Sequence, residues 1–189
     1  QLGYQGILLS EYFLRTGDQT VLPGLQELCN WCIDNQAAGG WGHGEGVGPG
    51  YVQSGLMNHA GIPILITLIL SQECGIKVDP VAYANAMKLM YRMAGHGCIA
   101  YGDHRSELWW SNTNGRNAML ACAFSLLNEH PPYKAASQHL ARLVTDSYFQ
   151  PEFGHTGGGF NVIWRGIASV HVPKTQQYFY HHQMKSLAW

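Results

Sequence analysis

Three histidines of this chain each follow an aromatic residue and a glycine. They lie in Trp-Gly-His at 41–43, in Tyr-Gly-Asp-His at 101–104 and in Phe-Gly-His at 153–155. An imidazole with a pKa of about 6.5 can take up or release a proton at neutral pH, and it is also a common metal ligand. The repeated motif therefore makes these histidines the first candidates for chemistry.

His43, His104 and His155 support two interpretations. They could form a divalent-metal site with Asp103 or Glu45 as a fourth ligand. Alternatively, each histidine ties its own loop to a neighbouring helix, and the repetition of the motif favours this second interpretation. The sequence has no close ligand pair such as His-Glu-x-x-His, so we expect no resident cofactor or metal.

The densest group of polar and aromatic residues is YGDHRSELWWSNTNGRN, which begins at Tyr101. Asp103 could orient the imidazole of His104 for general acid or base catalysis. Trp109 and Trp110 offer flat apolar faces that can stack on sugar rings. In the alternative, structural interpretation, Asp103 caps a turn, His104 binds a backbone carbonyl, and the tryptophans fill space between helices.

These residue types fit the cleavage of a polysaccharide by β-elimination. A lyase needs a group that neutralises a uronate carboxylate, for which Asn114 and Arg116 are candidates, and a group that moves a proton, for which Tyr101 and His104 are candidates. The same segments could instead hold a glycan or peptide without catalysis, or serve only the packing of the fold.

A hydrolase would need two carboxylates about 5 Å or about 6.5–9.5 Å apart, and Glu45 with Asp103 is the candidate pair. We therefore predict Tyr101, Asp103, His104 and Glu45 as catalytic residues. The predicted substrate-binding residues are His43, Trp109, Trp110, Asn114, Arg116, Asn117, His155 and Trp164.

Composition excludes some classes of partner. Only 12% of the 189 residues are charged, and the 11 basic and 12 acidic residues are scattered, so we expect no nucleic acid as a partner. The most apolar run, IPILITLIL at 62–70, is too short to span a bilayer, so we expect no membrane segment. A glycan or another small molecule remains the expected ligand.

The five cysteines are an odd number at irregular spacing, which does not indicate a disulfide framework. Cys29 and Cys32 form a Cys-x-x-Cys pair, but they lie in a helical pattern and no second pair follows at zinc-finger spacing. We interpret the cysteines mainly as small buried apolar residues.

The elements that position the candidate residues are predicted to be helices. Four segments are apolar nearly all round, which is typical of inner helices: 6–14, 61–70, 118–127 and 160–170. Each is followed by a helix with a polar stripe, as in 81–93, where Asn85, Lys88 and Arg92 share one face. The other outer helices are expected at 21–36, at 133–149 and around 181–182.

Short turns join each inner helix to its outer helix, and long glycine-rich segments lead to the next inner helix. This order predicts a single all-α domain over residues 1–189, built of about four helical hairpins as part of an α/α toroid with its long loops on one rim. Closed toroids have about six hairpins, so we expect an open arc or a fragment of a six-hairpin barrel. The rest of a parent chain or an oligomeric partner is then expected to complete it.

Several motifs in this order resemble a known family: GGWGHG, GLMNHAG, ILSQECGIKVD, IAYGDHRSELWW, NTNGRNAMLACAFSLL and FGHTGGGFNVIW. They look like the DUF6288 family, within the broader group of six-hairpin and α/α-toroid proteins, and the likeness runs over nearly the whole chain. The resemblance implies a toroid domain that is often part of a longer bacterial protein. It implies no particular activity.

Overall fold

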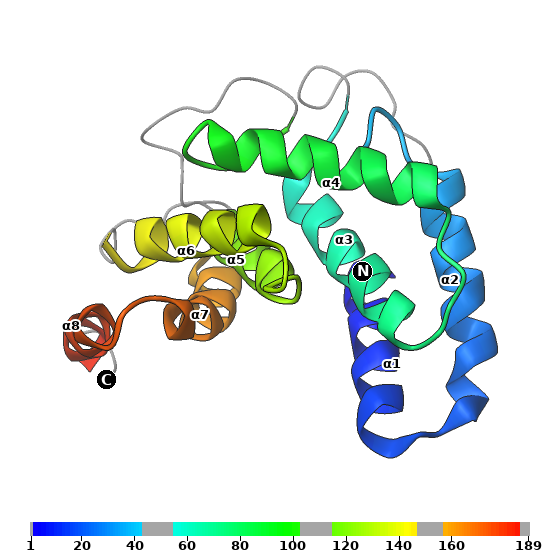
Figure 1. Cartoon of the computed structure of the whole chain (residues 1–189), viewed down its shortest axis with the longest axis horizontal. Helices are drawn as coiled ribbons and strands as arrows, with labels where there is room; N and C mark the ends of the chain where they lie inside the picture. Colours follow the sequence, from blue (N-terminus) through cyan, green and yellow to red (C-terminus); the bar gives the residue numbers. More distant parts are fainter. Residues whose placement is uncertain (1, 43–54, 103–114, 147–156, 186–189) are drawn as a thin grey trace. The chain divides into compact units, whose positions relative to one another are not determined.

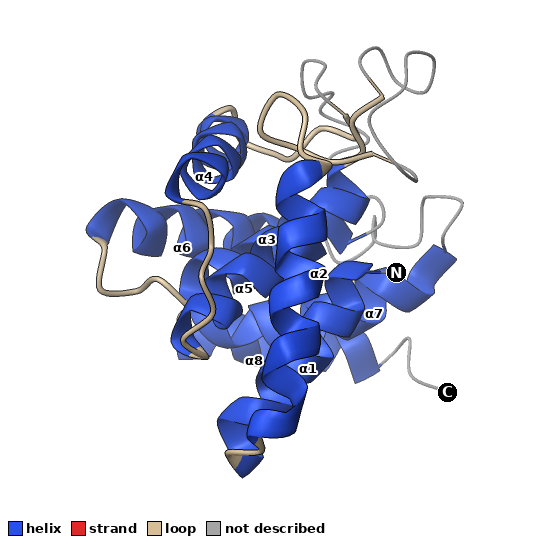
Figure 2. Cartoon of the chain, turned by 90° about the vertical axis from the view of Figure 1, so that its right-hand side faces the viewer, coloured by secondary structure: helices blue, strands red, loops and turns tan. Residues whose placement is uncertain are grey.

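The chain is all-helical in the part that its computed structural model describes, which is residues 2–42, 55–102, 115–146 and 157–185. No β-strand occurs there, only two isolated bridges, and Figure 2 shows helices joined by loops. The α-helices are α1 (Leu2–Thr16), α2 (Leu22–Asp34), α3 (Asn58–Glu73), α4 (Pro80–Gly95), α5 (Arg116–Ser125), α6 (Pro131–Asp146), α7 (Gly157–Ala168) and α8 (Lys174–Lys185). Two 3-10 helices, η1 (Gln19–Val21) and η4 (Ser169–His171), lie next to α2 and α7.

The predicted all-α class is confirmed for the described residues, and the helices occur in the predicted order along the chain. The arrangement of inner and outer helices stays a prediction. Some ends differ: α3 begins three residues before the expected 61, and α6 begins at Pro131 because proline fits a first helical turn, where its missing N–H leaves nothing unpaired. Asp79 caps α4, since its Oδ1 accepts the backbone N–H of Ala82 at 2.7 Å. The closure of the hairpins into a toroid stays a prediction.

The chain divides into two compact units. Unit 1 comprises Gln1–Met90 with Tyr101–His104, and unit 2 comprises Tyr91–Ala100 with Arg105–Trp189. In unit 1, α1 and α2 run in opposite directions beside each other, and α3 packs along α1 (Figure 1). In unit 1, α1 therefore packs against two other helices of the same unit.

The contact between α1 and α3 depends on small residues. A Cβ atom at Gly3 would lie 2.6 Å from the carbonyl carbon of Pro63, and one at Gly6 would overlap the side chain of Thr67. The hydroxyl of Thr67 donates to the Gly3 carbonyl at 2.7 Å. Glycine is needed at these two positions because the two helices approach so closely.

In unit 2, α5 packs against α6 and α7. Ser137 of α6 donates its hydroxyl to the Ala121 carbonyl of α5 at 2.7 Å, and the Phe124 and Tyr133 rings stack with centroids 5.4 Å apart. The α5 residues from Ala118 to Phe124 are all buried, which fits the apolar sequence predicted there, and the polar Arg116 and Asn117 before them are buried as well.

The five cysteines are free and buried, as predicted. Burial raises the pKa of the Cys32 and Cys122 thiols to about 12, so neither forms a thiolate at neutral pH. The helices that the structure describes include none with both the length and the apolar character needed to cross a membrane.

Candidate functional site

Two of the three aromatic-glycine motifs meet the start of α3 within unit 1. The backbone N–H of Met57 donates to the Trp41 carbonyl at 2.8 Å, and the backbone N–H of Asn58 donates to the Tyr101 carbonyl at 2.9 Å. The first amides of a helix have no partner inside the helix. Here the motif carbonyls supply those partners, so these two amides are not available to an anion.

The Asn58 side chain strengthens the same contact. Asn58 is only 1% exposed, and its Nδ2 donates to the Gly102 carbonyl at 2.7 Å. One residue therefore holds the backbone of both Tyr101 and Gly102, directly before Asp103 and His104 in the sequence. Tyr101 itself is half-buried.

Trp41, the aromatic residue of the first motif, has a structural role. Its ring is 3% exposed, and its indole N–H donates to the Cys32 carbonyl in the last turn of α2 at 2.6 Å. The ring also lies beside Gly61 of α3, where a Cβ atom would be 3.5 Å from it. Trp41 thus ties its segment to α2 and α3.

Arg116 and Asn117, at the start of α5 in unit 2, likewise form hydrogen bonds from their side chains to the backbone of another segment. The Asn117 Oδ1 accepts the backbone N–H of Ile99 at 2.9 Å, and the Arg116 Nε donates to the Ile99 carbonyl at 3.1 Å. Both side chains are 1% exposed, and Ile99 is fully buried. Two predicted substrate-binding residues therefore lie together and hold one backbone position.

Trp164, on α7, is 7% exposed, and the neighbouring Arg165 is 6% exposed. The Arg165 guanidinium carbon lies 5.6 Å from the centre of the Tyr180 ring, and its Nη2 is 2.9 Å from the Met184 sulfur. Burial raises the pKa of Tyr180, and the adjacent Arg165 opposes part of that rise. This cluster joins α7 to α8.

Four of the twelve predicted site residues lie in the described part of the chain: Tyr101, Arg116, Asn117 and Trp164. The other predicted residues lie outside it, so their placement stays a prediction: Glu45, His43, Asp103, His104, Trp109, Trp110, Asn114 and His155. Among the residues that the structure does describe, no three histidine, cysteine, aspartate or glutamate side chains come close enough to hold a metal ion.

Asn58 is not among the twelve predicted site residues, yet it donates two hydrogen bonds to the backbone of Tyr101 and Gly102. The available signal is a polar residue at the start of an otherwise apolar segment, GLMNHAGIPILITLIL. A buried polar side chain in such a segment needs a partner, but the sequence does not reveal that the partner lies 44 residues away.

The family model described as "Domain of unknown function (DUF6288)" matches residues 1–189. The chain therefore belongs to the DUF6288 family. No curated protein and no solved structure matches the chain.

Proposed function

We propose that this DUF6288 member is a carbohydrate-active enzyme of the α/α-toroid type, with its site on the glycine-rich segments that precede the inner helices. The observation that carries the proposal is the pair of hydrogen bonds that Asn58 donates, from its backbone N–H to the Tyr101 carbonyl and from its side-chain amide to the Gly102 carbonyl. It fixes the chain immediately before Asp103 and His104. Catalytic groups work best when the backbone that carries them is held rigidly.

The favoured chemistry is β-elimination from a uronic-acid polysaccharide. In this proposal His104 removes the proton next to the carboxylate, Tyr101 returns a proton to the leaving oxygen, and Asp103 orients the imidazole. Arg116 is buried and bonded to Ile99, so the task of neutralising the substrate carboxylate falls to Asn114. Trp109 and Trp110 then bind the neighbouring sugar rings.

A non-catalytic glycan- or peptide-binding module is the second candidate. Trp41, Arg116 and Asn117 use their side-chain polar groups on backbone atoms, so none of these three contacts requires catalysis. Such contacts hold loops in place and need no reaction to explain them. In that case the aromatic residues of the segments supply binding alone.

The test is incubation of the full chain with a panel of uronate polysaccharides while the absorbance of an unsaturated product is followed. We expect product from the wild-type chain and a loss of rate of about a hundredfold or more in His104→Ala and in Tyr101→Phe. His182→Ala, an exposed histidine on α8, is the matched control and should keep full activity.

The appearance of new reducing ends without an unsaturated product would indicate hydrolysis. Glu45→Gln and Asp103→Asn would then test whether these two carboxylates catalyse it. Glycan binding without any product would replace the enzyme proposal by the binding module. If calorimetry detects no binding to any glycan of the panel and no product forms, both carbohydrate proposals are wrong.

A further inference from the structure

One side of α8 contacts a cation of α7. Tyr180 and Met184 lie four positions apart, which places them on the same side of α8. Arg165 reaches both of them: its Nη2 donates to the Met184 sulfur at 2.9 Å, and its guanidinium carbon lies 5.6 Å from the centre of the Tyr180 ring. Arg165 and Tyr180 are both buried. The guanidinium is therefore held in place beside the Met184 sulfur.

Met184 differs from the other sulfur-containing residues in its exposure. All five cysteines and all six methionines lie in the part of the chain that the structure describes. The cysteines are buried, and Met184 is half-buried. The methionines that are at most 5% exposed are Met57, Met87, Met90, Met93 and Met119. Solvent therefore reaches Met184 more easily than it reaches the other ten of these residues.

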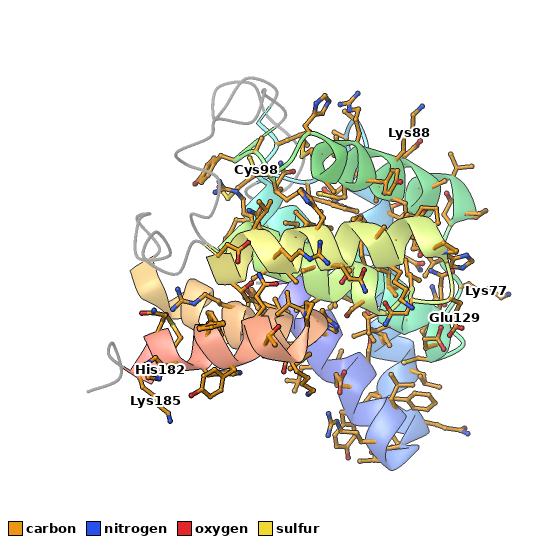
Figure 3. All side chains as sticks on the ribbon, turned by 60° about the vertical axis from the view of Figure 1, so that its left-hand side comes forward. Lys77, Lys88, Cys98, Glu129, His182 and Lys185 are labelled. Carbon is orange, nitrogen blue, oxygen red and sulfur yellow. The ribbon has the colours of Figure 1, made fainter. Side chains whose placement is uncertain are left out.

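Met184 also lies where a helix opens most easily, because α8 ends at Lys185 and the last turn of a helix frays. Figure 3 shows His182 and Lys185 projecting from this end of α8, and both are exposed. The thiols compete poorly for an oxidant, since the thiolate is their reactive form and each of them is buried. A small oxidant is therefore expected to react first with Met184.

We propose that Met184 is a site of reversible oxidation by hydrogen peroxide, and that Arg165 binds the oxygen of the resulting sulfoxide. A lone pair of the Met184 sulfur attacks one peroxide oxygen, so an S–O bond forms as the O–O bond breaks. The leaving hydroxide takes the proton of the transferred oxygen and departs as water. The sulfur loses two electrons, and the peroxide gains them.

Arg165 determines what the oxidation does to the fold. A thioether sulfur is a weak acceptor, whereas a sulfoxide oxygen is polar and accepts a charge-assisted hydrogen bond from a guanidinium. The unbranched Met184 side chain can turn so that this oxygen faces Arg165. Oxidation should therefore strengthen the contact between α7 and α8, although methionine oxidation usually disrupts packing. A methionine sulfoxide reductase reverses the step, since two thiols become a disulfide and the oxygen leaves as water.

The first experiment locates the oxidation by peptide mass spectrometry. The folded full chain is treated with dilute hydrogen peroxide at pH 7, and cleavage after Lys174 and Lys185 gives the segment 175–185, whose single methionine is Met184. This segment should gain the mass of one oxygen atom about tenfold or more faster than any segment with a buried methionine. A buried methionine that is oxidised as fast as Met184 would overturn the proposal.

The second experiment compares melting temperatures before and after oxidation, followed by circular dichroism. The wild-type melting temperature should rise by about 2–4 °C on oxidation, because a charge-assisted bond replaces a weak one. Met184→Leu, the control of similar volume, should show no change. In Arg165→Leu the sulfoxide has no guanidinium to bind, so oxidation should lower the melting temperature instead.

Treatment of the oxidised wild-type chain with a methionine sulfoxide reductase and a dithiol should restore both the mass of segment 175–185 and the original melting temperature. A wild-type melting temperature that falls or stays constant on oxidation would overturn the role of Arg165, and this comparison does not depend on whether Arg165→Leu folds. The same rise in Met184→Leu as in the wild type would show that another residue causes it, and would overturn the proposal.

Discussion

Helices α3 and α5 are buried on nearly every side, whereas α1 and α7 have similar apolar sequences and expose part of them. Every α3 side chain from Gly61 to Ser71 is buried, but Leu8 of α1 is 68% exposed and Ile163 of α7 is 60% exposed. Apolar sequence therefore does not decide burial by itself. Burial of a helix depends on whether a neighbour packs on each of its sides, and among these four helices the exposed apolar residues lie on α1 and α7.

The largest expected effect is on the free energy of unfolding, when a buried leucine and an exposed leucine are each replaced by alanine. Leu68→Ala in α3 removes a fully buried side chain and should lower the free energy of unfolding by about 2–5 kcal/mol. Leu8→Ala in α1 should change it by less than about 0.5 kcal/mol in dilute, monomeric protein. Urea titration monitored by circular dichroism measures both values. Equal losses in the two variants would show that α1 is as enclosed as α3.

The second largest effect on stability is expected when a glycine of α1 is replaced by alanine. Gly3→Ala pushes a methyl group against the Pro63 backbone and should cost about 1–3 kcal/mol of stability. Gly24→Ala in α2 meets nothing within 4 Å and should instead raise stability by about 0.4–1 kcal/mol, because alanine has less backbone freedom to lose on folding. Thermal denaturation of both variants provides the comparison. A Gly3→Ala protein as stable as Gly24→Ala would contradict the close α1–α3 contact.

Much of the helical framework could be predicted from the sequence. Uniformly apolar segments alternate with segments that have a polar stripe. This local pattern predicted the bounds of α1 to α7 to within about four residues, and it placed α8 only around residues 181–182. Short turns were also predicted between α1 and α2 and between α3 and α4, but the 3-10 helix η1 was not. Periodicity and capping residues are local signals, so one sequence is enough to detect them.

The contacts around the candidate site could not be predicted in the same way. Arg116 was predicted to bind a substrate, and the structure places it on the Ile99 carbonyl, 17 residues away. Asn58 reaches Gly102 across 44 residues. Sequence patterns show that a polar side chain is present, but the choice between a ligand and a backbone partner depends on which segments the fold brings together.

Loss of a contact at the start of α5 should have a smaller effect. Asn117→Ala leaves the buried N–H of Ile99 without its acceptor and should cost roughly 1–2 kcal/mol. Asn85→Ala, on the exposed face of α4, is the control and should leave stability nearly unchanged. Hydrogen exchange adds a local measurement, since the Ile99 amide should exchange faster only in Asn117→Ala. Unchanged exchange there would rule out the Asn117 contact.

The smallest effect on stability at neutral pH is expected from the ionisation of the buried thiols. The pKa of Cys32 and of Cys122 is about 12 in the folded chain, above the ordinary value of 9.0, so the folded state keeps protons that the unfolded state releases. These groups therefore stabilise the fold fully below about pH 9 and lose that contribution as the pH rises towards 12. Thiol labelling of the native chain should be slow at pH 7 and should accelerate only on unfolding. Rapid labelling of either cysteine in the folded chain would contradict its burial.

The difference between the exposed face of α1 and the buried helix α5 is tested most directly by thiol labelling. Leu8→Cys places a thiol at a position that is 68% exposed, whereas the native Cys122 of α5 is buried. In the folded chain at pH 7 the introduced thiol should react rapidly, and Cys122 should react only on unfolding. Equal reaction rates for the two thiols in the folded chain would contradict the account.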